Sequence, residues 1–297
     1  MGLGLPLGCN HRSARGFIVV AVLWILAALS ALVLIYLTYV TNTAVVVAGS
    51  TDRVQTEALV TAGVELAAYR LTAVKEDKRA TSGAFNARTG AARLSVTFRS
   101  EAARIDLNMA PKELLVGLIV GFGGTPENAA DYADRIVAWR TPAKSGDDDP
   151  ENASYRAAGL GYTPRHAPFP EIEELWLVRG IPPAVVERML PFVTVFSNLA
   201  SVNILDAAPQ VLAALPDMTP EKLQAVLSQR SDPGSDPRSL GDAASSSKAY
   251  RVSVGVAFDN GRRSGAEVII LLLEDGDEPY RVLSWRNASD GAPQRVN

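Results

Sequence analysis

The sequence predicts an α+β fold, with one long N-terminal helix, an antiparallel sheet, and a helical insert between two β regions, in a chain of 297 residues. A long run near the N-terminus is apolar and uncharged, which is typical of a helix that leaves water. Two later regions alternate apolar and polar residues, as half-buried strands do. The segment between them has helical spacing broken by Pro and Gly, and with 47% hydrophobic residues the chain can bury a core.

The apolar run is long enough to cross a membrane. No charged residue lies between 16 and 51, and residues 17–40 are almost wholly apolar. As a helix this run measures about 36 Å, which exceeds the roughly 30 Å hydrocarbon core. His11, Arg12 and Arg15 precede it without an acidic partner, so the positive-inside rule keeps the N-terminus cytoplasmic. A cleaved secretory signal is the alternative, although the small-residue sites after the run are loose.

Helical spacing continues beyond the predicted span. Apolar residues recur every three or four positions up to Val74 among charged ones, which indicates an amphipathic extension that packs one face on a sheet. One helix from Phe17 to about Val74 is the simplest interpretation.

Two β regions flank the insert. Residues 91–107 alternate on either side of 99–101, which predicts two strands in a hairpin. Three further strands are expected at 250–258, 266–274 and 280–285, because turn-rich sequences separate them. They predict an antiparallel meander packed against the N-terminal helix.

Composition argues against catalysis and against nucleic-acid binding. Cys9 is the single cysteine, so the chain alone builds no disulfide and no thiolate zinc site. The two histidines are His11 and His166, and the second lies in a proline-rich loop with no evident partner. A formal net charge of -3 gives no general attraction to nucleic acid. We therefore expect a structural protein rather than an enzyme.

An acidic run is the strongest candidate for a metal site. It comprises Asp147, Asp148, Asp149 and Glu151. Calcium prefers several oxygen ligands from a short loop, so these residues are candidate calcium ligands. Their spacing is not that of an EF-hand, and a solvated acidic loop is the alternative.

A weak internal repeat lies within the insert. Residues 105–111 parallel 202–209, and each stretch precedes an apolar helix. Asn108 and Asp206 are the expected helix caps. A helix-hairpin-helix DNA-binding module is the alternative, but Asp217 stands where phosphate would approach.

The boundary before the apolar run carries a family resemblance. Arg15, Gly16 and Phe17 resemble the class III signal of type IV prepilins and type II secretion pseudopilins. The resemblance implies that a prepilin peptidase cuts between Gly16 and Phe17 and methylates the new N-terminus at Phe17. Ala21 stands where most of these proteins have a glutamate that helps assembly. The minor pseudopilin K family (GspK) lacks this glutamate.

The resemblance to pseudopilin K extends through most of the chain. Four stretches of the insert match the family pattern in order and spacing, at 104–115, 133–140, 170–196 and 201–230. The resemblance implies a pilin-like fold, calcium in the insert, and a place at the tip of a periplasmic pseudopilus anchored in the inner membrane. The implied partners are minor pseudopilins I and J, the major pseudopilin, the inner-membrane assembly platform and the prepilin peptidase.

The expected organisation has six parts: a leader (1–16), a transmembrane helix (17–40), a pilin-like helix with a first hairpin (41–107), a helical insert (108–230), a flexible linker (231–248) and a C-terminal meander (249–297). A minor pilin of a type IV pilus and a membrane-anchored DNA-binding protein are the alternative functions. The pilus alternative predicts a glutamate at position 21, and the DNA alternative predicts salt-sensitive duplex affinity.

Overall fold

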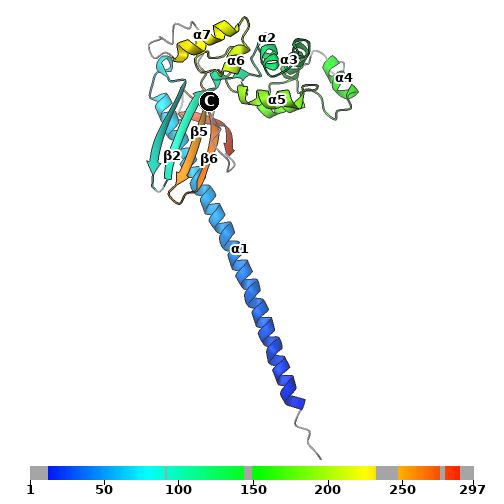
Figure 1. Ribbon diagram of the computed structural model, residues 1–297, viewed down its shortest axis with the longest axis vertical. Coiled ribbons are helices and arrows are strands. Elements are labelled where there is room, and N and C mark those ends of the chain that lie inside the picture. The colour runs from blue at the N-terminus through cyan, green and yellow to red at the C-terminus, as the bar shows by residue number, and fades with distance from the viewer. Residues whose placement is uncertain (1–12, 91, 144–148, 232–246, 275–277, 288–297) are drawn as a thin grey trace, which may run out of the picture. The chain divides into compact units, whose positions relative to one another are not determined.

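The computed structural model describes residues 13–90, 92–143, 149–231, 247–274 and 278–287 (Figure 1). The leader with Cys9 and His11, the acidic residues Asp147 and Asp148, and most of the expected linker lie outside the described residues. The chain divides into two units, residues 1–58 and 59–297.

The expected long N-terminal helix is confirmed. Helix α1 spans Ser13–Thr72. Within it, Val19–Tyr39 is long and apolar enough to cross a membrane, with a mean hydropathy of 2.7. This segment buries no residue in the protein, as expected of a span whose apolar surface faces lipid or other helices. A short 3-10 helix, η1 (Glu76–Lys78), follows the end of α1.

A five-stranded antiparallel sheet follows in the second unit. Its strands are β1 (Ser82–Thr89), β2 (Ala92–Ser100), β5 (Ala249–Phe258), β6 (Arg263–Leu272) and β7 (Tyr280–Asn287), in the order β1-β2-β5-β6-β7. Burial alternates along β2 and β5, because one face packs and the other meets solvent. The expected C-terminal meander is thus confirmed.

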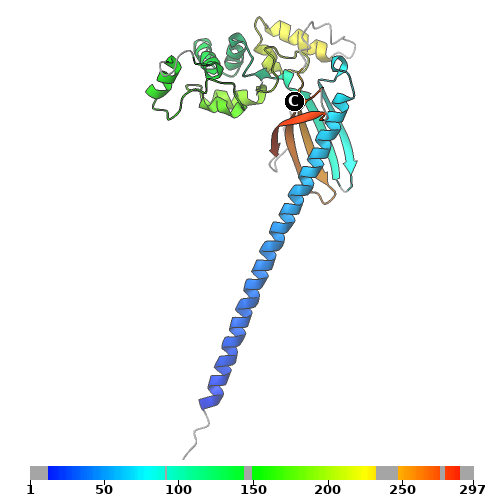
Figure 2. The same ribbon diagram turned by 180° about the vertical axis from the view of Figure 1, so that it is seen from behind.

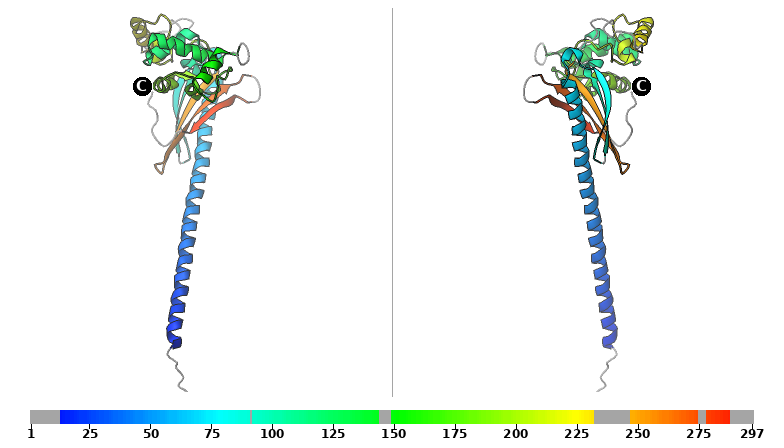
Figure 3. Two further views of the ribbon diagram at one scale, coloured as in Figure 1. Left: turned by 90° about the vertical axis from the view of Figure 1, so that its right-hand side faces the viewer. Right: turned by 90° about the vertical axis from the view of Figure 1, so that its left-hand side faces the viewer.

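The last turns of α1 cover one face of this sheet (Figures 2 and 3). Buried residues of α1 after position 59, among them Val64 and Leu71, form one core with the apolar face of the strands. The helix approaches the sheet closely at Gly63, where an added Cβ would lie 2.7 Å from a methyl carbon of Val254. A glycine in mid-helix therefore lets helix and sheet approach.

The expected position of the first hairpin is wrong. The chain turns at Gly90 (φ 53°) between β1 and β2, not at residues 99–101. At Ser100 the chain leaves the sheet, because the Ser100 hydroxyl accepts from the backbone N–H of Ala102 and begins the 3-10 helix η2 (Glu101–Ala103). The sequence pattern does not predict strand β1, because Phe85 is the one large apolar residue in it.

The helical insert between β2 and β5 has its own core. It contains α2 (Lys112–Gly121), α3 (Pro126–Arg140), α4 (Pro150–Ala157), η4 (Ile172–Leu177), α5 (Pro183–Met189), η5 (Leu190–Phe192), α6 (Pro209–Ala213) and α7 (Pro220–Ser231), with β3 (Ile105–Asp106) parallel to β4 (Val193–Thr194). Trp139 is buried in this core and stacks on Phe169 with ring centroids 6.0 Å apart. The two clusters of buried residues have no member in common.

The internal repeat corresponds to a repeated turn, but the expected caps are wrong. Asp106 accepts from the backbone N–H of Asn108 at 2.8 Å, and Asn203 accepts from that of Leu205 at 2.8 Å. Pro111 and Ala208, rather than Asn108 and Asp206, precede the two helices, and neither makes a side-chain cap. Asp106 and Asn203 therefore close turns that come before the helices, and they do not cap the helices themselves.

Candidate functional site

The residues of the predicted processing and assembly site all lie in α1. The bond between Gly16 and Phe17 lies in its first turn, and Ala21 follows one turn later. The methyl group of Ala21 offers neither charge nor hydrogen bond, so it provides no partner for an amine of a neighbouring subunit. Peptidase cleavage and methylation stay predictions.

The apolar surface of the span is continuous. Its large side chains are exposed, including Trp24, Tyr36 and Tyr39, which are about two-thirds to three-quarters exposed. Tyr36 and Tyr39 lie at the end of Val19–Tyr39, where amphipathic rings favour the membrane interface. This agrees with a single-pass membrane anchor.

Two of the four predicted calcium ligands are described. Asp149 caps α4, because its Oδ1 accepts the backbone N–H of Glu151 at 2.8 Å and that of Asn152 at 3.4 Å. Glu151 Oε1 is buried without a hydrogen-bond partner among the described atoms. An unpaired buried carboxylate oxygen is costly unless a cation or water satisfies it.

His166 does have partners, contrary to expectation. Its Nδ1 lies 3.1 Å from the carbonyl oxygen of Thr141, and its Nε2 lies 2.9 Å from Oδ1 of Asn152. Thr141 precedes the acidic loop and Asn152 follows it, so the imidazole connects the two ends of that loop. The backbone of His166 has a positive φ of 52°, which is uncommon for a residue other than glycine.

No metal centre can be assembled from described residues alone. Within these parts of the chain, no three His, Cys, Asp or Glu side chains are grouped as metal ligands. Asp149 and Glu151 are brought together at the start of α4, whereas Asp147 and Asp148 lie outside the described residues. The fit to calcium therefore rests on the hard oxygen donors of Asp149 and Glu151 and on the unpaired Oε1 atom.

A buried ionic cluster joins the insert to the sheet, and sequence reasoning missed it. Glu101, 1% exposed, accepts from Arg251 Nε of β5 at 2.8 Å and from the hydroxyl of Thr194 in β4. Arg251 also pairs with Glu267 of β6. The alternation of residues 91–107 predicts a hairpin turn at Glu101, where a carboxylate faces water, so the pattern does not indicate a buried partner.

The electrostatics of this cluster favour the charged forms. Burial alone would raise the pKa of Glu101, but the charge and hydrogen bond of Arg251, the charge of Arg104 and the hydroxyl of Thr194 together outweigh burial, so the pKa is lowered below its usual value. Burial, together with the charge of Arg251, lowers the pKa of Arg104 to about 10. Arg251 thus pairs with the carboxylates of Glu101 and Glu267, and its charge repels the guanidinium of Arg104.

Several backbone groups in the turns of the helix-hairpin-helix alternative are already bound within the protein. At residues 177–182 the backbone N–H of Arg179 donates to the hydroxyl of Tyr155 at 2.8 Å, and Arg135 Nη1 donates to the Arg179 carbonyl at 2.9 Å. In the second turn the N–H of Met218 donates to Leu215, and Asp217 adopts φ 60°. The DNA-binding interpretation is not favoured.

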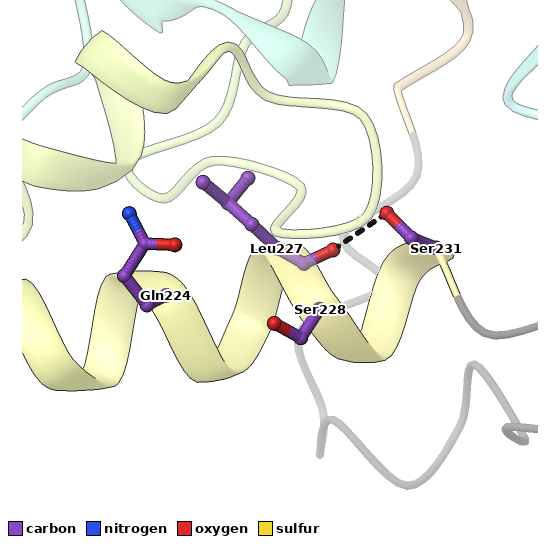
Figure 4. Close-up of a pocket in the computed structure, with 4 residues that line it drawn as sticks. All are labelled: Gln224, Leu227, Ser228 and Ser231. Carbon is purple, nitrogen blue, oxygen red and sulfur yellow. Dashed lines mark hydrogen bonds between the residues drawn. The ribbon is translucent and has the colours of Figure 1, made fainter.

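A shallow pocket on α7 has no charged side chain in its lining. Gln224, Leu227, Ser228 and Ser231 line it (Figure 4). The Ser231 hydroxyl donates to the carbonyl of Leu227 at 2.9 Å, which is ordinary helix back-bonding. None of the four side chains is charged.

Comparison with known proteins is consistent with this architecture. A family model described as "Type II secretion system (T2SS), protein K" matches residues 97–198, from the end of β2 to just beyond β4. One similar solved structure is described as the crystal structure of the GspK-GspI-GspJ complex from the type 2 secretion system of enterotoxigenic Escherichia coli. Its matching chain is 16% identical, with a TM-score of 0.56, and the match covers 81% of this chain and 98% of that chain. No curated protein sequence matches.

At this identity the structural match establishes the fold. The expected α+β, pilin-like architecture, with a long N-terminal helix on an antiparallel sheet and a helical insert, is confirmed. The family model supports the resemblance independently, because it covers the first part of the insert.

Proposed function

We propose that this chain is a protein K of the type II secretion system, and that it caps the periplasmic tip of the pseudopilus, where it initiates assembly and supports export across the outer membrane. The match of residues 97–198 to the protein K family model supports the proposal. The observation that carries this proposal is the insert with its own core between β2 and β5. A domain enlarged in this way is too bulky for the crowded shaft of a helical filament, but fits at its end.

Ala21 supports the same position. If the peptidase cuts after Gly16, Ala21 is the fifth residue of the mature chain. A carboxylate there would pair with the N-terminal amine of a neighbouring subunit, and burying one charge without the other is costly. A subunit with alanine at this position has no buried carboxylate that must pair with the N-terminal amine of a neighbour, as expected of a terminal subunit.

The proposal includes a membrane stage before assembly. Val19–Tyr39 anchors the chain in the inner membrane with its N-terminus cytoplasmic, and the ectodomain is periplasmic. Prepilin peptidase acts at Gly16 and Phe17 on the cytoplasmic side. The helix then joins those of pseudopilins I and J, with the major pseudopilin and the assembly platform extending the filament below. The role is mechanical rather than catalytic.

The test is co-purification from membranes. The full chain is co-expressed with prepilin peptidase and tagged pseudopilins I and J, and solubilised in mild detergent. The expected result is a complex with one copy of each, measured by native mass spectrometry. Recovery of this chain alone, or in long filaments without I and J, would contradict the proposal. A minor pilin of a type IV pilus would instead bind the minor pilins of that system.

We further propose that the acidic loop binds calcium. Asp149 and Glu151, together with Asp147 and Asp148, would supply hard oxygen ligands, and Glu151 Oε1 is buried without a hydrogen-bond partner among the described atoms. The ion would hold the loop against α4 and so stiffen this part of the insert.

Calcium at 1 mM is therefore expected to raise the melting temperature of the full chain by several degrees, since a bound ion stabilises the folded state by mass action. Magnesium, which dehydrates reluctantly, should do so less. Glu151→Gln should abolish the shift, while Glu127→Gln at the start of α3 should leave it unchanged. A shift of equal size in both variants would rule out this site.

A further inference from the structure

The face of the sheet opposite α1 carries a pattern of arginines that folding does not explain. Figure 1 looks onto this face, and Figure 2 shows α1 on the other side. Residues of β2 that point away from the apolar core begin with Arg93 and end with Arg99. Both are exposed, as is Arg263 at the start of β6.

Arginines stand directly opposite one another at two places on this face. The antiparallel register pairs Arg88 of β1 with Arg93, and Arg99 with Arg251 of β5. Like charges in directly opposite positions destabilise a sheet. Two such pairs on one face therefore need compensating acids.

The available acids satisfy one member of each pair. Asp259 Oδ2 lies 3.2 Å from Arg88, and Glu101 and Glu267 both bind Arg251. Within the described residues, Arg93, Arg99 and Arg263 make no ion pair. The charge of Arg99 also acts on two nearby arginines. The pKa values of Arg104 and Arg230 are lowered mainly by burial, and Arg99 lowers both of them further.

The surface between these arginines carries hydroxyl groups, and the one carboxylate of β6 beside them, Glu267, is bound to Arg251. Ser95, Thr97 and Ser253 occupy it, and Gly255 of β5 lies opposite both Ser95 and Gly265 of β6. The pairing places Arg263 two strands from Arg93, about 10 Å across the sheet, and Arg99 about 20 Å from Arg93 along β2. The backbone groups of β2 and β5 are already used by neighbouring strands, so recognition here must come from side chains.

We propose that this arginine face, defined as Arg93, Arg99, Arg263, Ser95, Thr97 and Ser253, docks an acidic surface of a partner protein. Guanidinium groups bind carboxylates in a bidentate manner, and the hydroxyls between them complete the hydrogen bonding. The partner presents two carboxylates about 10 Å apart and a third about 20 Å from the first. The proposal rests on the sheet and does not require the tip position.

A protein partner fits better than nucleic acid or lipid. The named face has no aromatic side chain on which a base could stack, which single-stranded binders use. It has no exposed apolar side chain to enter a bilayer, which membrane-surface binding needs. The guanidiniums also surround a polar floor rather than forming the continuous basic stripe typical of duplex binding.

The experiment measures binding of a fluorescent twelve-residue peptide of alternating Glu and Ser to the full chain in neutral detergent. The Kd should rise at least about tenfold in Arg93→Glu/Arg263→Glu, since two attractive contacts become repulsive. The matched control is Lys75→Glu/Lys78→Glu, which makes the same change in net charge beside α1 and should shift Kd less than about twofold. Unchanged melting temperatures exclude misfolding.

Several outcomes would overturn the proposal. Equal loss in both variants would show that net charge alone attracts the peptide, and absence of binding would show that the face takes no carboxylates. Tighter binding to phosphatidylglycerol vesicles or to duplex DNA, lost through the same arginines, would replace the protein partner by that ligand. Concentration-dependent self-association of the full chain, lost in Arg93→Glu/Arg263→Glu, would make the occupant a second copy.

Discussion

Replacing Glu101 by glutamine is expected to lower the free energy of unfolding by about 3–5 kcal/mol, because it leaves the buried guanidinium of Arg251 without its main counter-charge. Glutamine keeps the shape of the side chain and a hydrogen bond to Thr194, so the loss reports the charge. The effect should be visible as a lower midpoint of urea unfolding of the full chain in detergent. It should be strongest where the insert meets the sheet, measured as faster amide exchange in η2, β4 and β5.

The matched control is Glu274→Gln. Glu274 pairs with Lys248 on the surface, with both side chains more than two-fifths exposed, and such solvent-screened pairs contribute little to stability. If the Glu101 and Glu274 variants lost similar stability, the buried cluster would not be the element that joins the two parts.

Acid should weaken the same junction. The pKa of Glu101 is lower in the folded chain than its ordinary value, so its contribution is fully present above the unfolded value of about 4.5. That stability is lost as pH falls through the lower folded pKa. Wild-type protein should therefore lose more stability below about pH 4 than Glu101→Gln does, and parallel curves would contradict the assignment.

Replacing Gly16 by leucine is expected to abolish processing and, with it, assembly. The peptidase must accept a residue without a side chain before the cut, and leucine fills that space. An uncut chain keeps a polar leader with His11, Arg12 and Arg15 attached to the helix, and these charges cannot enter an apolar helix bundle without a large cost. The variant should remain in the membrane and no longer co-purify with pseudopilins I and J.

A leader glycine away from the cut provides the control. Gly8→Leu makes the same chemical change within the leader and should leave cleavage intact. Both variants can be compared by the mobility of the full chain on denaturing gels with and without the peptidase. Equal cleavage of Gly16→Leu and wild type would exclude the Gly16 to Phe17 bond as the cut.

Much of the fold could be predicted because strong patterns have few structural solutions. The uncharged run within α1 can form only a membrane-length helix or a secretion signal, and the alternation in β5 to β7 repeats three times with turn residues between. Strand β1 was missed since its small and polar residues lack the usual β-branched signal. The internal repeat of the insert corresponds to a repeated turn. Spacing alone does not show that Asp106 and Asn203 are the residues that close these turns, because that depends on backbone geometry.

The site was less predictable for a related reason. The Glu101 cluster brings together residues more than ninety positions apart, through a strand end, a short 3-10 helix and a two-residue parallel pairing. Short elements of this kind leave little periodicity in a sequence. The arginine face needed the strand register as well, because a shift of one residue would place Arg93 and Arg99 on the apolar side.

The most direct measurement is the intact mass and N-terminal sequence of the chain, isolated from cells with and without prepilin peptidase. A peptidase-dependent start at N-methylated Phe17 is the result expected of a pseudopilin. An uncut chain in both cells, or a start beyond about Ala44, would contradict the account and return the protein to an ordinary anchored or secreted domain.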